Sequence, residues 1–445
     1  MKKEVFLEKY KDKVFLIVGF TYRTGYSVAK FFDDNGIKYK ISDLKKNQTL
    51  LSNLKNCIKF FSGSQTSDQL ENVDIIILSP GVPKSIPLIK SAENNNIPVF
   101  SDIDFLFPLF EEKEIIAVTG TDGKTTTVSI LKDIFENYKK VRIAGNIGIP
   151  IASLIEDIDN FDSLILEMSS FSLEDLKNFK PDISTVLNIA EDHLNRYSNL
   201  EEYAKTKFNI IKFSDSSDFF IKNLDNEFTS KFNVENINIK TISKEKKEAD
   251  YYFFENNFCY KDNKFSYSDC KITGNHNIEN ILASIAISDI AGIPFDIIQK
   301  SIKNFSGVSH RLEFVGTFKE IDVYNDSKAT TVHATVSAID SFPKNIILIM
   351  GGQDKGLDFS AIKNYEDRIK FLVCYGEAGE YIRSFLNFEN SIFIKDFIEA
   401  VSFASYQANK GDVILLSPGC SSWDQHESFE ERGDIFKKTV KNILG

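Results

Sequence analysis

A short apolar run that passes directly into a glycine-containing loop lies at residues 115–127, which read Ile-Ile-Ala-Val-Thr-Gly-Thr-Asp-Gly-Lys-Thr-Thr-Thr. The apolar run predicts a buried strand, and residues 128–135 predict a helix. Backbone N–H groups of such a loop, together with the positive end of the following helix, form a cradle for anions. Lys124 can reach a β- or γ-phosphate, and Thr125 can offer its hydroxyl to Mg²⁺. This stretch therefore predicts an α/β domain that binds a nucleotide.

One position departs from the usual phosphate-binding pattern, because Val118 stands where a glycine is expected five residues before Gly123. A strand, a turn and a helix with a solvated lysine would give a similar sequence. The order of strand, loop, Gly-Lys-Thr and helix favours phosphate binding over that simpler interpretation. The loop predicts a nucleotide but does not define the reaction.

The size, charge and composition of the chain argue against some classes of function. Its 445 residues suggest about three domains. The net charge of −11 and the pI of about 5.2 argue against nonspecific nucleic-acid binding, because no large basic field is available. The five cysteines are scattered and odd in number, which favours reduced thiols. Residues 1–13 do not read as a signal peptide, and no apolar run approaches the roughly 20 residues that span a bilayer, so we expect a cytoplasmic protein without membrane insertion.

The first hundred residues begin with a Rossmann-like pattern. Residues 14–19 predict a strand that ends in glycine, 26–35 a helix, and 39–42 a second strand followed by Asp43. The G-x-G-x-x-G fingerprint is absent, which argues against an ordinary dinucleotide site. A nucleotide diphosphate in the same place stays open, with Asp43 on a ribose or a uracil. Equally, the loop glycines could only permit tight turns, and Asp43 could only cap the next segment.

Two further strands are predicted to bring polar residues to the edge of the phosphate-loop sheet. Residues 163–167 form an apolar run that ends in Glu167, the usual place for a carboxylate linked to Mg²⁺. Residues 183–189 form the next run, and His193 follows it. Glu167 could instead be a helix N-cap acid, and a lone histidine is more often structural than a ligand. We favour metal binding by Glu167, because a phosphate loop needs a Mg²⁺ partner.

The segments after residue 213 predict small hairpins and then a long helix. Residues 251–254 and 257–260 are short aromatic-rich runs that favour an antiparallel hairpin. Asn277 and Asn280 lie three residues apart, ahead of an apolar helix at 281–291. Their side-chain amides could form hydrogen bonds with the edge of an adenine, or they could cap the helix.

The last third of the chain predicts a second alternation of strands, polar loops and helices. Strands are expected at residues 322–325, 346–350, 371–375 and 413–417, and a helix at 429–443. Arg311 is a candidate phosphate clamp. Lys328 and Lys355 could bind an anionic substrate. Taken alone, each of them is more simply explained as a lysine exposed to solvent.

These segments together resemble the Mur ligase family, and the resemblance covers almost the whole chain. It rests on motifs in the expected order and spacing, at residues 120–126, 166–171, 188–197, 274–280, 310–311, 325–330, 351–356 and 415–433. The resemblance implies an α/β fold of three domains. These are a Rossmann-like N-terminal domain at 1–109, a central P-loop ATPase domain at 110–305 and a Rossmann-like C-terminal domain at 306–445.

The resemblance implies ATP-dependent amide formation in peptidoglycan precursor synthesis. In the family, the carboxylate of a UDP-sugar takes the γ-phosphoryl group of ATP, and the amine of an amino acid then displaces phosphate from the acyl phosphate. The loops at 326–330 and 417–425 favour D-glutamate as the amine and UDP-MurNAc-L-Ala as its acceptor. The expected protein is a monomer with these small-molecule partners and no nucleic acid.

The catalytic and metal-binding roles of the family carry over to five residues, one of which is Lys207. Lys124 would neutralise the triphosphate, with one Mg²⁺ at Thr125 and Glu167 and a second Mg²⁺ near His193. The family carries a carbamylated lysine that supports the second ion.

The family's carbamate-lysine pattern aligns with residues 203–210 and places the carbamate on Lys207. An alignment shifted by two residues would place it on Lys205.

The remaining binding roles fall into three groups. ATP would be held by Gly120, Thr121, Asp122, Gly123, Lys124, Thr125, Thr126, Asn277, Asn280, Arg311 and Asp326. D-glutamate would be surrounded by Lys328, Thr330, Lys355, Ser422, Trp423 and Phe429. The UDP-sugar would be contacted by Phe20, Thr21, Asp43, Asn146 and Ser169.

The chain also departs from the family pattern. Its first loop, residues 19–25, is one residue longer than usual, Ser172 replaces a common Gln and Asn195 a common Asp. We expect the two substitutions to leave activity intact.

Three other interpretations fit parts of the sequence. Another member of the family, adding a different amino acid or acting on folate, would share the ATPase chemistry. A nucleotide-regulated binding protein would lack turnover, and the combination of Lys124, Glu167 and His193 weighs against it. An NAD-dependent enzyme is disfavoured by the missing glycine fingerprint.

Overall fold

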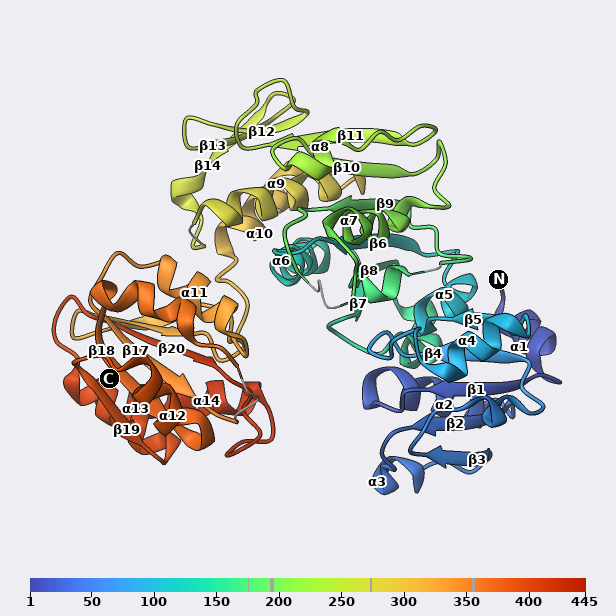
Figure 1. The fold of residues 1–445 in the computed structure, drawn as a ribbon. Coiled ribbons are helices and arrows are strands. Elements are labelled where there is room, and N and C mark those ends of the chain that lie inside the picture. The colour runs from blue at the N-terminus through green and yellow to red at the C-terminus, as the bar shows by residue number, and fades with distance from the viewer. Residues whose placement is uncertain (175, 193–195, 273, 354–356) are drawn as a thin grey trace. The chain divides into compact units, whose positions relative to one another are not determined.

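The computed structural model describes residues 1–445 except 175, 193–195, 273 and 354–356, and it divides into two compact units, Met1–Phe305 and Ser306–Gly445 (Figure 1). Both units are α/β, with mostly parallel strands flanked by helices. The expected α/β class with Rossmann-like and P-loop domains is confirmed.

The first sheet of the N-terminal unit contains parallel strands in the order β3-β2-β1-β4-β5. The strands are β1 (Val14–Val18), β2 (Lys38–Asp43), β3 (Cys57–Ser62), β4 (Ile75–Leu78) and β5 (Val99–Phe100). The helices are α1 (Lys3–Tyr10), α2 (Ser27–Asp34), α3 (Gln48–Leu51), α4 (Pro87–Asn94) and α5 (Asp102–Leu106), with single turns at η1 (Tyr22–Tyr26), η2 (Ser67–Leu70) and η3 (Phe107–Leu109). The strand order reverses between β1 and β4, and ligands of open α/β sheets bind at such a switch point.

The second sheet carries the phosphate loop and has the order β14-β13-β12-β11-β10-β9-β6-β8-β7. Its strands are β6 (Glu114–Thr119), β7 (Val141–Gly145), β8 (Ser163–Glu167), β9 (Ile183–Val186), β10 (Phe219–Asn223), β11 (Asn238–Ser243), β12 (Tyr251–Phe254), β13 (Asn257–Tyr260) and β14 (Asn263–Ser266). Its helices are α6 (Lys124–Glu136), η4 (Ile151–Asn160), η5 (Phe171–Leu173), α7 (Leu200–Phe208), η6 (Asn209–Ile211), α8 (Glu227–Lys231), η7 (Tyr267–Asp269), α9 (Asn275–Ile290) and α10 (Phe295–Asn304). Because β6 lies between β8 and β9 in parallel, the carboxyl ends of these three strands meet at one edge.

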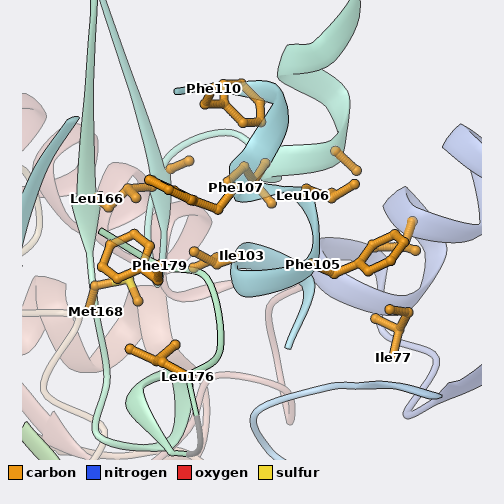
Figure 2. Close-up of a cluster of buried hydrophobic side chains, with 14 of the residues drawn as sticks. Ile77, Ile103, Phe105, Leu106, Phe107, Phe110, Leu166, Met168, Leu176 and Phe179 are labelled. Carbon is orange, nitrogen blue, oxygen red and sulfur yellow. The ribbon is translucent and has the colours of Figure 1, made fainter. Parts of the chain in front are cut away.

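The segment that links the two sheets is part of a continuous apolar core. Ile77 of β4 and Leu166 of β8 belong to the same buried cluster, and Phe105 and Phe107 lie between them (Figure 2). Asp104 strengthens this junction, because its carboxylate accepts the backbone N–H groups of residues 177–179 at 2.8–3.1 Å. The two sheets therefore form one compact unit with a shared apolar core.

The C-terminal unit contains a sheet with the order β15-β16-β20-β17-β18-β19, in which only β15 is antiparallel among the described strands. Its strands are β15 (Glu313–Phe318), β16 (Ile321–Asn325), β17 (Ile346–Gly351), β18 (Ile369–Tyr375), β19 (Ser391–Ile394) and β20 (Val413–Gly419). Its helices are α11 (Val332–Asp340), η8 (Ser360–Arg368), α12 (Gly376–Leu386), α13 (Phe397–Gln407) and α14 (Phe429–Leu444). The helices bury apolar faces on both sides of the sheet, as two separate clusters of core residues. In the described part of the chain, no helix is long and apolar enough to cross a membrane.

Most predicted elements are present, with corrected limits. The hairpin predicted at 251–254 and 257–260 forms as β12 and β13 and continues the parallel sheet. The helix after the phosphate loop begins at Lys124 rather than at residue 128. The β-branched run at 125–127 hides this start in the sequence, since threonine has a low helix propensity. The helix predicted at 281–291 begins at Asn275 for a related reason, because its first turn is polar.

Candidate active site

The phosphate loop joins β6 to α6 through a tight turn that requires glycine. Gly123 has a φ of 81° and lies against the side chain of Asn280, so that a Cβ atom there would come within 2.1 Å of the Asn280 Oδ1. Gly120 has a φ of 155° and approaches the chain at Leu187. The loop can thus hold its N–H groups toward an anion at the start of α6.

Contacts with the loop after β9 hold the phosphate loop in place. Thr121 N donates to Asn188 O at 2.9 Å, and Asp122 N donates to Asn188 Oδ1 at 2.8 Å. Lys124 Nζ donates to the carbonyl oxygens of Gly120 at 2.8 Å and Thr121 at 2.7 Å. The clamping role of Asn188 was not predicted from the sequence, because it depends on two parallel strands being neighbours.

Lys207 brings a second lysine onto the same loop. Its side chain is only 1% exposed, and its Nζ donates to Gly120 O at 2.8 Å. Burial lowers the pKa of this amine well below its usual value, and the nearby charge of Lys124 lowers it further. Lys205, the alternative in the sequence, is exposed on the outer side of α7. Lys207 therefore places a buried amine, with a pKa below its usual value, against the phosphate loop.

Glu167 is the described carboxylate that best suits a cation in this site. It is 2% exposed at the end of β8, and its Oε1 accepts the Asn146 Nδ2 at 3.2 Å. Its Oε2 is buried and has no hydrogen-bond partner among the described residues. Thr125, in the first turn of α6, is also buried. A carboxylate oxygen without a partner and a threonine hydroxyl are the hard oxygen donors that Mg²⁺ prefers, so these residues fit the ion.

Two predicted site residues, His193 and Lys355, lie outside the described residues. Within the described ranges, no group of three or more His, Cys, Asp or Glu side chains forms a metal site. A metal site at the phosphate loop would therefore also need ligands of another kind, such as the Thr125 hydroxyl, or ligands outside the described residues.

The two asparagines predicted at the adenine have different surroundings. The Asn280 amide is 3% exposed, accepts the Thr127 hydroxyl at 3.3 Å and donates to Asn277 Oδ1 at 3.1 Å. It also fills the space opposite Gly123. The geometry therefore supports a role for Asn280 in fixing α6 and the phosphate loop, with Asn277 the more accessible amide.

Asn280→Ala should weaken ATP binding by about tenfold, because the loop loses the side chain that packs on Gly123. Calorimetric titration with ATP would measure the effect. The matched control is Asn137→Ala, which removes an amide at the far end of α6 that bonds Ser301 and should bind ATP normally. Equal affinity of Asn280→Ala and the wild type would contradict this role.

The residues predicted at the UDP-sugar lie at the carboxyl edges of the two N-terminal sheets. Asp43 ends β2 and accepts the backbone N–H of Phe20 with one oxygen and that of Lys45 at 3.0 Å with the other. Thr21 is exposed in the loop after β1. Asp43 therefore orders that loop, and each of its oxygens can still accept a bond from a ligand.

Asn146 and Ser169, the other two residues predicted at the UDP-sugar, belong to the second sheet. Asn146 lies against Glu167, whereas the Ser169 hydroxyl bonds to that of Ser172 at 2.9 Å.

In the C-terminal unit, Arg311 and Asp326 lie close enough to interact electrostatically. Asp326 is 6% exposed and accepts the Leu312 N–H at 3.0 Å and the Ser417 hydroxyl at 2.9 Å. Burial raises the pKa of this carboxyl to about 7, although Ser417 and Arg311 oppose the shift.

Asp326→Asn should reduce the pH dependence of the stability of this unit. The folded carboxyl holds its proton up to a pH of about 7 and the unfolded one only to about 4, so the folded state binds more protons in between. The free energy of unfolding should therefore fall as the pH rises through this window. Urea titrations at pH 5 and pH 7.5 should show a steeper fall for the wild type than for Asp326→Asn. Equal falls would contradict the assignment.

Most of the described residues predicted at D-glutamate gather around two loops. The Lys328 Nζ lies 5.8 Å from the centroid of the Phe429 ring, and Ser422 is 2% exposed in the loop after β20. Thr330 is half-buried after β16, whereas Trp423 is 69% exposed. The structure thus brings Lys328 and Phe429 together, and it leaves most of the Trp423 ring in solvent.

Arg432 is a buried support for these loops that was not predicted from the sequence. Its guanidinium is 0% exposed and donates to Ser327 O at 2.7 Å, to Cys420 O at 3.2 Å and to the Tyr375 hydroxyl at 3.1 Å. An arginine in a predicted helix is usually expected at the surface, so only the packing in the structure shows that Arg432 is buried and supports these loops.

The fold and the phosphate loop define the class of protein as a nucleotide-binding α/β protein of three domains. Three family models match the chain in order: the Mur ligase MurD-like N-terminal domain at residues 13–101, the Mur ligase middle domain at 118–288, and the Mur ligase glutamate ligase domain at 310–420.

Full-length relatives support the same assignment. A protein of Clostridioides difficile (strain 630) is 37% identical, covering 97% of this chain and 99% of its own length. One of Chloroherpeton thalassium is 36% identical, with coverage of 98% and 99%. Both are named UDP-N-acetylmuramoylalanine–D-glutamate ligase. The chain belongs to the Mur ligase family.

Solved structures of lower identity share the fold. The UDP-N-acetylmuramate-alanine ligase of Thermotoga maritima aligns with a TM-score of 0.60 at 19% identity, covering 97% of this chain and 99% of its own. The MurF ligase of the same organism, in complex with ADP, aligns with a TM-score of 0.58 at 19% identity and coverage of 91% and 95%.

Proposed function

We propose that this protein is an ATP-dependent ligase that joins D-glutamate to UDP-N-acetylmuramoyl-L-alanine in cytoplasmic peptidoglycan precursor synthesis. The observation that carries the proposal is the buried Lys207 amine, 2.8 Å from Gly120 O of the phosphate loop, in a chain whose full-length relatives bear that activity in their names. The protein acts as a monomer on small molecules.

The reaction has two steps, and residues of this chain position the reacting groups. The L-alanyl carboxylate attacks the γ-phosphorus of ATP, and ADP leaves with the electrons of the broken P–O bond. The D-glutamate amine then attacks the acyl carbon, and the tetrahedral intermediate loses phosphate and a proton. Phosphoryl transfer depends mainly on positioning and charge neutralisation. The phosphate loop and Lys124 supply both for the phosphates.

The metal and the carbamate are assigned by the same proposal. Thr125 and Glu167 would hold one Mg²⁺, and Lys207 as a carbamate would hold a second together with His193. When bound, the ions would screen the negative charge on the phosphates and on the acceptor carboxylate. The buried oxygen of Glu167 without a partner supports the first site, and the depressed pKa of Lys207 supports the second, because only a neutral amine takes up CO₂.

The substrates are assigned to three groups of residues. The UDP-sugar is bound by Phe20, Thr21, Asp43, Asn146 and Ser169. ATP is assigned to residues 120–126, Asn277, Asn280, Arg311 and Asp326. D-glutamate is bound by Lys328, Thr330, Lys355, Ser422, Trp423 and Phe429.

The test is phosphate release from ATP with UDP-MurNAc-L-Ala, in a Mg²⁺ buffer that contains bicarbonate. D-glutamate should support release, whereas L-glutamate, L-lysine and the reaction without an amine should not. Release with another amine would keep the ligase chemistry and overturn the amino-acid choice. No release with any of these amines would contradict the proposal and favour a nucleotide-regulated binding protein.

A further inference from the structure

The side chain of Arg196 connects loops from the two sheets of the N-terminal unit. Its Nε and Nη2 donate to the two oxygens of Glu174, each at 2.9 Å, and its Nη1 donates to Pro80 O at 3.2 Å. The guanidinium also lies 4.1 Å from the centroid of the Phe171 ring. The arginine and glutamate side chains are only 17% and 15% exposed. A bidentate, partly buried pair that stacks on a ring is strong and directional.

The loop that Arg196 contacts borders the switch point of the first sheet. Pro80 lies between Ser79 and Val82, which follow β4, and both of these side chains would be 2.8 Å from a Cβ atom at Gly19. The Ser79 hydroxyl donates to Gly19 O at 2.7 Å. The loop after β4 therefore supports the loop after β1, where the UDP moiety is assigned.

On its other side, Arg196 is linked to the phosphate loop. Glu174 Oε1 also accepts the Tyr197 hydroxyl at 2.9 Å, and the ring of Tyr197 lies 5.3 Å from that of Tyr203. The Thr121 hydroxyl donates to the Tyr203 oxygen at 3.4 Å. A continuous set of contacts thus runs from the UDP-side loop to the loop that holds the phosphates.

Arg196 is not what holds the two sheets together. The shared apolar core and the bonds of Asp104 to residues 177–179 do so independently. Loss of the guanidinium should therefore leave the unit folded and change only the local position of the loop after β4.

We propose that Arg196 is a positioning residue that holds the loop after β4 at the phosphate-loop edge, so that the bound UDP-sugar presents its carboxylate to the γ-phosphate. This inference rests on the proposed function. Its consequence is selective, since the affinity for the UDP-sugar depends on Arg196 while the affinity for ATP does not.

The experiment compares the wild type with Arg196→Ala and Arg196→Lys. Calorimetry with UDP-MurNAc-L-Ala should give binding at least about tenfold weaker for Arg196→Ala, with ATP affinity within about twofold of the wild type. The KM for the UDP-sugar should rise, whereas the KM values for ATP and D-glutamate should stay unchanged. Arg196→Lys should resemble Arg196→Ala, because an ammonium lacks the fork that binds Glu174 and Pro80 together.

The control is Arg142→Ala, which breaks another arginine–carboxylate pair of the N-terminal unit, between Arg142 of β7 and Asp157 of η4. It should leave all three KM values unchanged. Unaltered UDP-sugar affinity in Arg196→Ala, full affinity in Arg196→Lys, or an equal loss of ATP affinity would overturn the inference.

The wild-type measurements separate this inference from the proposed function. If the wild type binds UDP-MurNAc-L-Ala but does not turn over with D-glutamate, the assignment of D-glutamate as the amine is refuted. The ratio of the UDP-sugar affinities of Arg196→Ala and the wild type would still decide the role of Arg196. Absence of wild-type binding would refute both.

Discussion

Lys207→Arg should lower the rate of amide formation by about a thousandfold or more, the loss expected when a preorganised charged group is removed from a phosphoryl-transfer site. An arginine stays protonated and cannot become a carbamate. The lysine can, because burial and the charge of Lys124 lower the pKa of its amine and so favour the neutral form that takes up CO₂. An assay of ADP release coupled to product formation would measure the change. Lys205→Arg, two residues away and exposed, is the matched control and should retain activity within about twofold.

Dependence on CO₂ separates the carbamate from a purely electrostatic role for Lys207. Wild-type activity should decline in CO₂-free buffer and recover when bicarbonate is added. Lys207→Met, which has a similar volume and no charge, keeps the packing and should be inactive with or without bicarbonate. Wild-type rates in Lys207→Arg or Lys207→Met, or wild-type activity that does not respond to CO₂, would refute the assignment.

Arg432→Met should destabilise the C-terminal unit by about 3–5 kcal/mol. The substitution removes the buried hydrogen bonds from the guanidinium to the carbonyl oxygens of Ser327 and Cys420, and each such loss costs about 1–3 kcal/mol. Urea unfolding, combined with hydrogen exchange to assign the transition to residues 306–445, would measure the effect. Binding of D-glutamate should weaken in parallel, because Ser327 and Cys420 precede the loops that carry Lys328 and Ser422.

Arg368→Met is the control for the loss of an arginine in the same unit. Its guanidinium pairs with Asp340 at the surface, where the side chains are 33% and 50% exposed. Such pairs contribute about 0–1 kcal/mol, so the stability should change little. A comparable change in both variants would show that the buried hydrogen bonds of Arg432 are not responsible.

Local patterns were enough to predict the strands that carry the site. The apolar runs at 163–167 and 251–254 coincide with β8 and β12, because short buried strands are bounded by abrupt changes in polarity. The start of α6 was predicted too late, since its first turn is rich in threonine. Half-exposed edge strands such as β3 and β19 were not predicted, because their alternation of polar and apolar residues is weak.

The sequence by itself determined the class of fold, the order of the domains, the phosphate loop and the family, because these depend on short runs of neighbouring residues. Only the tertiary structure decided which lysine of α7 faces the phosphate loop, since Lys205 and Lys207 differ in burial and not in residue type. It also decided that Asn280 packs on Gly123 and that Arg432 is buried. The contacts of Asn280 with Thr127 and of Arg432 with Ser327 join residues that are 153 and 105 positions apart. The energy of such contacts depends on desolvation and distance, which a linear pattern does not contain.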